Sequence, residues 1–132
     1  MRLAIVDDEE VFRRQIEGAI GNLYGRESVS CYLYSDGKSL LQSIDNGNKF
    51  DAIFLDIEMK ELDGMSTAKK LRDSHNTTPI IFITSHVEMA MDGYEVAAFR
   101  FLGKPIDPER LKSVLSDLEE MLYKESAITV SK

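Results

Sequence analysis

Residues 51–64 read DAIFLDIEMKELDG, and this stretch decides the fold. Ala52 to Leu55 form an unbroken apolar run that leads directly into Asp56. A continuous run of this kind is typical of a strand that is buried on both faces, as in parallel sheets covered by helices. The stretch therefore predicts an α/β domain with a carboxylate at the end of a central strand.

Three further apolar runs and one alternating segment, residues 29–34, have the length of strands, and helical periodicity lies between them. We expect strands at residues 3–6, 29–34, 52–55, 80–83 and 97–102. We expect helices at residues 12–23, 40–44, 64–74, 87–93 and 108–122, where apolar residues recur three or four positions apart. Turn signals at Gly25, Asp36-Gly37 and Asn46-Gly47 separate some of these elements.

This alternation predicts a (βα)₅ chain of the doubly wound α/β class. Each strand returns to the sheet through a helix, so the strands must be parallel. In such sheets, ligand-binding and catalytic groups gather outside the carboxyl ends of the strands. The polar residues at the strand ends are therefore the candidate functional residues.

The composition fits one globular domain. The chain has 132 residues, of which 43% are apolar and 30% charged. Its one cysteine and the acidic cluster near the N-terminus, where a signal peptide would be apolar, predict a reducing, cytoplasmic setting. No apolar run approaches the about 18 residues of a membrane-spanning helix. The net charge of −7 disfavours DNA binding by this chain, so DNA contact would require an output domain that is not present here.

Four of the predicted strands deliver polar groups to one edge of the sheet. Asp7 and Asp8 follow the first strand, Asp56 the third, Thr84 the fourth and Lys104 the fifth. Three converging carboxylates repel one another unless a cation lies between them, and hard oxygen ligands suit Mg²⁺, with Mn²⁺ as an alternative. A carboxylate can attack a phosphoryl group when a metal ion, an ammonium and a hydroxyl neutralise the developing charge.

Each of these residues also has a purely structural interpretation. Asp8 is a plausible first-turn acid of a helix, Asp56 a turn residue, Thr84 a helix cap and Lys104 a solvated surface lysine. Their joint occurrence at the ends of different parallel strands favours a functional site, because capping alone does not produce it.

Four segments resemble the receiver domains of two-component response regulators: IVDDEE, DAIFLDIEMKELDG, PIIFITS and FRFLGKPID. The resemblance covers residues 1 to about 122, so we expect a receiver domain at residues 1–122 and a C-terminal tail at residues 123–132. It implies a flavodoxin-like fold with a five-stranded parallel sheet in the order 2-1-3-4-5, flanked by helices on both faces. It also implies a domain that accepts a phosphoryl group from a sensor histidine kinase and controls an output such as transcription.

The resemblance assigns a role to each site residue. Asp56 is the phosphoacceptor; Asp7, Asp8, Asp56 and the backbone carbonyl of Glu58 hold Mg²⁺; Lys104 pairs with the phosphoryl oxygens; Thr84 hydrogen-bonds them; and Phe101 is the aromatic switch residue. Such a domain is not an enzyme with an external substrate, although it catalyses its own phosphorylation and slow dephosphorylation. Receivers usually keep a cis peptide bond at the position of Lys104-Pro105.

The chain departs from the family pattern in places that bear on the site. Receivers commonly have proline where Lys60 stands, so we expect a less rigid loop after Asp56. Phe101 has no hydroxyl and should prefer burial more than tyrosine would. Glu58 and His86 stand two residues beyond Asp56 and Thr84, where receivers tune the lifetime of the phosphoryl group.

The stretch EMAMDGYEVAAFRFLGKPI, residues 88–106, is similar to receivers of regulators with a LytTR-type DNA-binding domain. The tail ESAITVSK, residues 125–132, is β-leaning and is interpreted as the start of a linker to such an output domain, with the frayed end of a stand-alone protein as the alternative. Met89, Met91 and Tyr94 belong to the core or to a homodimer surface formed by the fourth helix, fifth strand and fifth helix.

Two other functions remain open at this point. A phosphatase of the haloacid-dehalogenase type also uses an aspartate, Mg²⁺ and a lysine, but normally places its nucleophile after the first strand. A degenerate receiver would serve only as an interaction module. His75 and His86 lack a third ligand at metal-binding spacing, so we assign neither histidine to a metal site. We expect Cys31 to be a small core residue.

Overall fold

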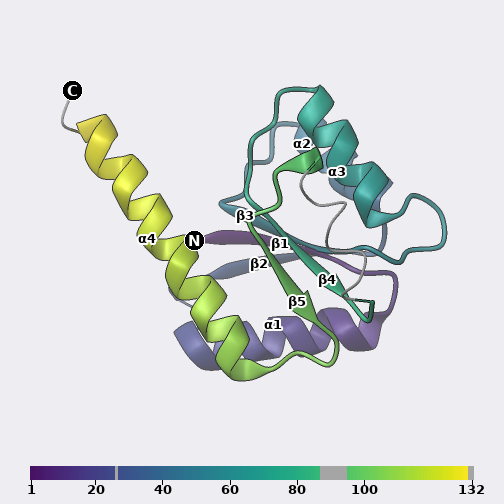
Figure 1. The fold of residues 1–132 in the computed structure, drawn as a ribbon, viewed down its shortest axis with the longest axis horizontal. Helices are drawn as coiled ribbons and strands as arrows, with labels where there is room; N and C mark the ends of the chain where they lie inside the picture. The colour runs from purple at the N-terminus through teal and green to yellow at the C-terminus, as the bar shows by residue number, and fades with distance from the viewer. Residues whose placement is uncertain (26, 87–94, 131–132) are drawn as a thin grey trace.

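A computed structural model describes residues 1–25, 27–86 and 95–130, with side chains described up to residue 125. Within these residues there are five strands and four helices (Figure 1). Their bounds are β1 Arg2–Val6, α1 Glu10–Tyr24, β2 Ser30–Tyr34, α2 Gly37–Asp45, β3 Ala52–Asp56, α3 Gly64–Asp73, β4 Ile80–Thr84, β5 Arg100–Gly103 and α4 Pro108–Val130. The helix expected at residues 87–93, with Met89, Met91 and Tyr94, lies outside the described residues.

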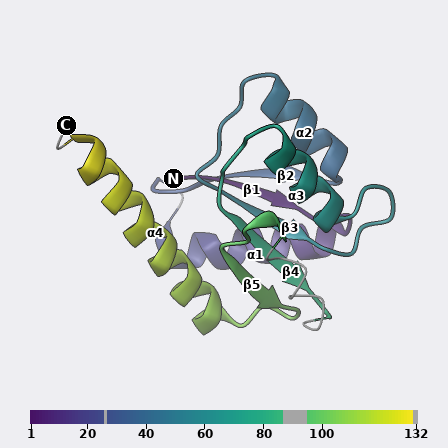
Figure 2. The same cartoon turned by 45° about the horizontal axis from the view of Figure 1, so that its top comes forward.

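The strands form one parallel sheet in the order β2-β1-β3-β4-β5, which confirms the predicted fold class. β3 lies at the centre, between β1 and β4. Helices α1 and α4 cover one face of the sheet, and α2 and α3 cover the other (Figures 1 and 2). The carboxyl ends of β1, β3, β4 and β5 therefore meet at one edge.

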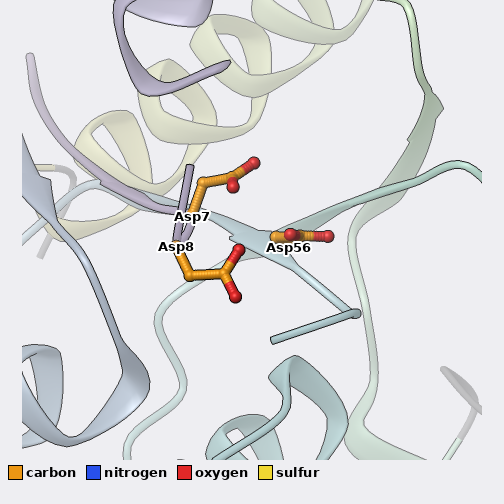
Figure 3. A group of neighbouring side chains, drawn as sticks. All are labelled: Asp7, Asp8 and Asp56. Atoms are coloured by element: carbon orange, nitrogen blue, oxygen red, sulfur yellow. The ribbon is translucent and has the colours of Figure 1, made fainter. Parts of the chain in front are cut away.

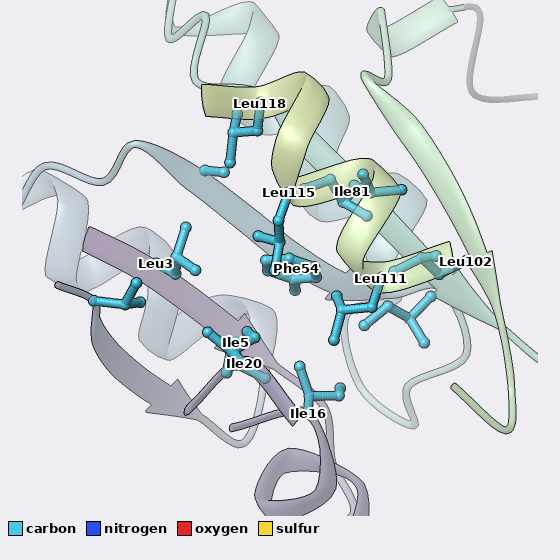
Figure 4. Close-up of a cluster of buried hydrophobic side chains, with 14 residues drawn as sticks. Leu3, Ile5, Ile16, Ile20, Phe54, Ile81, Leu102, Leu111, Leu115 and Leu118 are labelled. Atoms are coloured by element: carbon cyan, nitrogen blue, oxygen red, sulfur yellow. The ribbon is translucent and has the colours of Figure 1, made fainter. Parts of the chain in front are cut away.

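Alternate residues of the strands belong to two separate layers of the core, one on each face of the sheet. Leu3, Ile5 and Phe54 pack with side chains of α1 and α4 on one face (Figure 4). Ile53 and Leu55 belong to the layer on the other face, with α2 and α3. Every residue of β3 and β4 is buried, as expected for central strands of a covered parallel sheet.

The fifth strand begins later than its apolar run predicted. It starts at Arg100, and residues 97–99 precede it. Ala97 has a φ of 52°, outside the strand region, and the backbone carbonyls of Val96 and Ala97 accept hydrogen bonds from the guanidinium of Arg72 at 2.6 and 3.5 Å. An arginine on α3 thus fixes the approach to β5, and no local pattern in residues 97–102 contains that information.

The expectation of a β-leaning tail is wrong over the described residues. Helix α4 runs without a break to Val130, and its distal part extends beyond the sheet (Figure 1). Extending an existing helix adds one hydrogen bond per residue, whereas β-branched residues cost only about 0.5 kcal/mol each. The helix can therefore continue through Ile128, Thr129 and Val130. A domain boundary at residue 122 remains a prediction.

Cys31 is partly buried and packs against the core layer of α1 and α4. Burial, with a smaller contribution from the charge of Glu17, raises the pKa of its thiol to about 11. The thiol is therefore neutral at physiological pH and behaves as a small packing group.

One glycine fixes the distance between α3 and the carboxyl end of β3. A Cβ atom on Gly64 would overlap the backbone carbonyl oxygen of Asp56 and lie 2.8 Å from Cα of Ile57. The Gly64 amide also donates to the carbonyl of Ile57 at 2.9 Å. No side chain fits between the start of α3 and the residue at the end of β3.

We expect Gly64→Ala to lower the free energy of unfolding by more than about 2 kcal/mol, because the backbone at Asp56 would have to move. Gly18→Ala is the matched control, since nothing lies within 4 Å of a Cβ at this position in α1. The control should gain roughly 0.5–1 kcal/mol from helix propensity. Urea unfolding measures both changes, and equal stabilities for the two variants would contradict the close approach at Gly64.

Candidate functional site

Three carboxylates lie together at the carboxyl edge of the sheet (Figure 3). Asp7 and Asp8 follow β1 and Asp56 ends β3, and each offers an oxygen within 4.8 Å of the others. Asp7 and Asp56 are 0% and 2% exposed, while Asp8 is more open to solvent. The predicted convergence is confirmed, because β1 and β3 are neighbouring parallel strands.

Backbone amides hold two of these carboxylates in place. Oδ1 of Asp7 accepts from the amide of Glu9 at 2.9 Å, and Oδ1 of Asp56 accepts from the amide of Glu58 at 3.1 Å. Each aspartate thus closes a turn two residues long with one oxygen and keeps the second oxygen for the site.

Lys60 contributes through its backbone. Its amide donates to Oδ2 of Asp8 at 3.2 Å. A proline, which receivers commonly have at this position, carries no N–H and could not make this bond. The departure from the family pattern therefore ties the loop after β3 to Asp8, which differs from the simple loss of rigidity that the sequence suggested.

Lys104 is the cation of the site. Its Nζ lies 2.9 Å from Oδ2 of Asp7 and 3.3 Å from Oδ2 of Asp56, and its side chain is 9% exposed. The lysine follows β5, and its backbone amide donates to the carbonyl of Thr84 at 2.9 Å. The Lys104-Pro105 peptide bond is cis, as the resemblance predicted.

The carboxylates outnumber this one ammonium, and the pKa values of Asp56 and Lys104 are both raised. Burial and the charge of Asp7 raise the pKa of Asp56 to about 6, while Lys104 and the Glu58 amide oppose the rise. Burial lowers the pKa of Lys104, but the hydrogen bond to Asp7 and the charges of both aspartates outweigh it and leave the pKa raised. A site with surplus buried negative charge and hard oxygen donors fits a divalent cation such as Mg²⁺.

Thr84, the last residue of β4, is fully buried and hydrogen-bonded to both predicted lifetime-tuning residues. Its Oγ1 donates to Oε1 of Glu58 at 3.1 Å and accepts from the amide of His86 at 2.9 Å. Nε2 of His86 lies 3.3 Å from Oε2 of Glu58. The histidine side chain is 54% exposed and pairs with this carboxylate.

Phe101 lies on β5, paired with Phe82 of β4 across the sheet register. It is partly buried, and the two rings stack with centroids 5.5 Å apart and planes 27° from parallel. Thr84 on β4 and Phe101 on β5 thus lie on neighbouring strands, while the switch role of Phe101 remains a prediction.

Two residues of α1 that the sequence did not predict contact the site. The Phe12 ring centroid lies 4.1 Å from Nζ of Lys104, and Nη1 of Arg13 donates to the backbone carbonyl of Asp7 at 2.6 Å. Both lie within one turn of the start of α1, directly after the acidic pair. Their position directly after the acidic pair could have indicated a contact with the site. Phe12, however, also fits the apolar stripe of the helix, which predicts a core residue.

We expect Asp56→Asn to stabilise the metal-free protein at neutral pH. The pKa of Asp56 in the folded protein is about 6, above its ordinary 3.8, so the free energy of unfolding falls as the pH rises through this range and the carboxyl ionises. Asparagine has no charge to lose. The variant should be more stable than the wild type by about 2 kcal/mol at pH 7 and by less than about 1 kcal/mol at pH 4.

Urea unfolding in EDTA at both pH values measures this difference. The exposed Asp73→Asn is the matched control for the loss of a carboxylate elsewhere on the protein. A gain for Asp56→Asn that is equal at both pH values would contradict the raised pKa.

Comparisons with known proteins agree with this geometry. Residues 3–116 match the family model of the response regulator receiver domain. The chain is 35% identical over 115 residues to the positive alginate biosynthesis regulatory protein of Pseudomonas aeruginosa, which covers 87% of the chain and 46% of that protein. It is 32% identical over 119 residues to the transcriptional regulatory protein YpdB of Escherichia coli, covering 90% of the chain and 48% of YpdB.

A solved structure has the same fold. The response regulatory domain of MrkE from Klebsiella pneumoniae superposes with a TM-score of 0.82 at 30% identity, covering 94% of this chain and 99% of that one. The chain spans about half the length of the two regulators above. In the described part of the chain, no helix is long and apolar enough to cross a membrane. With residues 3–116 matched, the chain belongs to the receiver-domain family of two-component response regulators.

Proposed function

We propose that Asp56 is the phosphoacceptor of this receiver domain and that a sensor histidine kinase is the donor. One observation carries the proposal: the Asp56 carboxylate is buried, directly beside a second aspartate and an ammonium group. An Asp56 oxygen attacks the phosphorus of a phosphohistidine, a P–O bond forms, the P–N bond breaks, and the imidazole leaves. The product is an acyl phosphate on Asp56.

Asp7, Asp8, Asp56 and the backbone carbonyl of Glu58 would hold Mg²⁺, or Mn²⁺ in its place. The three carboxylates supply hard oxygen donors within 4.8 Å of one another, which supports this assignment. The bound ion supplies charge neutralisation at the phosphoryl oxygens. Because Asp56 has an unusually high pKa, the cation also favours the ionised, nucleophilic carboxylate.

Lys104 and Thr84 complete the neutralisation of charge. Lys104 already donates to Asp56 and would turn its ammonium to a phosphoryl oxygen. Thr84 would exchange its hydrogen bond with Glu58 for one with the phosphoryl group. Phe101 would then shift on β5, and the surface formed by β5 and α4 would change shape for its partner.

The wider biology follows from the family. Homologous regulators are about twice as long as this chain, which supports an output domain beyond a receiver at residues 1–122, with residues 123–132 leading toward it. The stretch 88–106 supports a LytTR-type DNA-binding output and control of transcription. We place the protein in the cytoplasm, with homodimerisation through the surface that the phosphoryl group switches.

The domain would catalyse its own phosphorylation and slow dephosphorylation and has no separate substrate. The phosphatase alternative has no support, because residues 3–116 match the receiver family. The degenerate interaction module lacks support as well, since the acidic, threonine and lysine residues are all in place.

We expect millimolar Mg²⁺ to raise the melting temperature of the wild-type protein at a neutral pH, above the pKa of about 6 of Asp56. Binding to the folded state alone adds RT ln(1 + [L]/Kd) to stability. Asp8→Ala should lose this increase and keep the fold, because Asp8 is the most exposed of the three. Sodium chloride of equal ionic strength is the salt control, and an equal rise with either salt would refute a specific cation site.

We expect acetyl phosphate with Mg²⁺ to add one phosphoryl group to the wild-type protein, as read by intact mass. Asp56→Ala should show no adduct, and EDTA should abolish it in the wild type. The exposed Asp73→Ala should be modified like the wild type. An adduct that persists in Asp56→Ala would place the phosphoacceptor elsewhere; steady release of phosphate without an adduct would favour a phosphatase.

A further inference from the structure

The ammonium of Lys104 faces an aromatic ring as well as two carboxylates. Nζ lies 2.9 Å from Asp7, 3.3 Å from Asp56 and 4.1 Å from the centroid of the Phe12 ring. The lysine side chain is 9% exposed. Its charge is therefore largely removed from water and bounded by the ring.

An aromatic ring suits this position on physical grounds. Its negative face attracts a cation, and the attraction grows when the cation is desolvated. Unlike a carboxylate or a hydroxyl, the ring has no lone-pair acceptor. It therefore does not compete strongly for the N–H groups of Lys104 that must reach a phosphoryl oxygen. It also adds no negative charge to a site that already holds three aspartates.

The start of α1 holds the ring in place. Phe12 is the third residue of α1, and its neighbour Arg13 donates to the backbone carbonyl of Asp7 at 2.6 Å. The Arg13 amide also donates to the carbonyl of Glu9 at 3.1 Å. The first turn of the helix is thus anchored to the same residue that accepts from Lys104.

We propose that Phe12 is a positioning residue for Lys104: its ring holds the ammonium beside Asp7 and Asp56, where it can reach a phosphoryl oxygen once Asp56 is phosphorylated. Without the ring, the long lysine side chain has more orientations open to it, and fewer of them direct Nζ to the phosphoryl oxygens. The inference rests on the proposed function of Asp56. The Phe12 ring would affect the rate of phosphoryl transfer and leave the nucleophile, Asp56, unchanged.

The test compares four versions of position 12 in phosphorylation by acetyl phosphate with saturating Mg²⁺. We expect Phe12→Leu to lower the second-order rate about fivefold and Phe12→Tyr to keep at least half of the wild-type rate. Pentafluorophenylalanine keeps the ring shape and reverses its face charge, so it should be as slow as leucine. Val11→Ala, an exposed neighbour on α1, is the control and should match the wild type.

A merely structural role for Phe12 predicts a different order. If packing alone matters, pentafluorophenylalanine will react like phenylalanine, and that result overturns the proposal, as does a wild-type rate for Phe12→Leu.

A second readout does not depend on phosphorylation. In metal-free protein, the loss of stability caused by Phe12→Leu should shrink in a Lys104→Met background, because the cation is gone. Additive effects of the two substitutions would overturn the contact. If the wild type takes up no phosphoryl group while this coupling is found, the proposed function fails and the Phe12–Lys104 contact stands.

Discussion

The site depends on one constraint: two buried carboxylates, Asp7 and Asp56, must be neutralised without water. Lys104 does part of this by donating to both, and it is itself almost removed from solvent. A single ammonium leaves surplus negative charge, which the raised pKa of Asp56 records. The site therefore favours binding of a further cation. A bound metal ion would lower the raised pKa of Asp56 and so favour its ionised form.

The sheet makes this arrangement possible. The order β2-β1-β3-β4-β5 places the ends of β1, β3, β4 and β5 at the same edge. There β1 and β3 supply carboxylates, β4 supplies the hydroxyl of Thr84 and β5 leads to the ammonium of Lys104. Two apolar layers, one on each face, fix the strands beneath them. Gly64 adds a local requirement, because α3 approaches the backbone of Asp56 too closely for a side chain. Fold stability and site geometry therefore share the same residues.

Hydrogen bonds hold the end of β4 at this edge, and stacked rings pack β4 against β5. Thr84 is hydrogen-bonded to Glu58 and His86. Two residues earlier on β4, Phe82 pairs with Phe101 of β5, and the two rings stack. A group that draws Thr84 toward Asp56 must first break its bond with Glu58. Glu58 and His86, at the positions that resemble tuning residues, thus both contact the threonine directly, and the threonine ends the strand that pairs with β5.

The sequence by itself determined the class of fold and the residues of the acidic edge. Apolar runs such as Ala52 to Leu55, each ending in a polar residue, are local signals that survive without knowledge of neighbours. Only the tertiary structure decided the contacts of Phe12 with Lys104, of the Lys60 amide with Asp8, and of Glu58 with Thr84. These pairs are far apart along the chain, and no periodic pattern encodes which side chains meet across strands. The late start of β5 also depends on a contact distant in sequence, because Arg72 binds the backbone before β5. The helical course of α4 to Val130 has a different cause, because helix propagation overrides the weak β preference of the last residues.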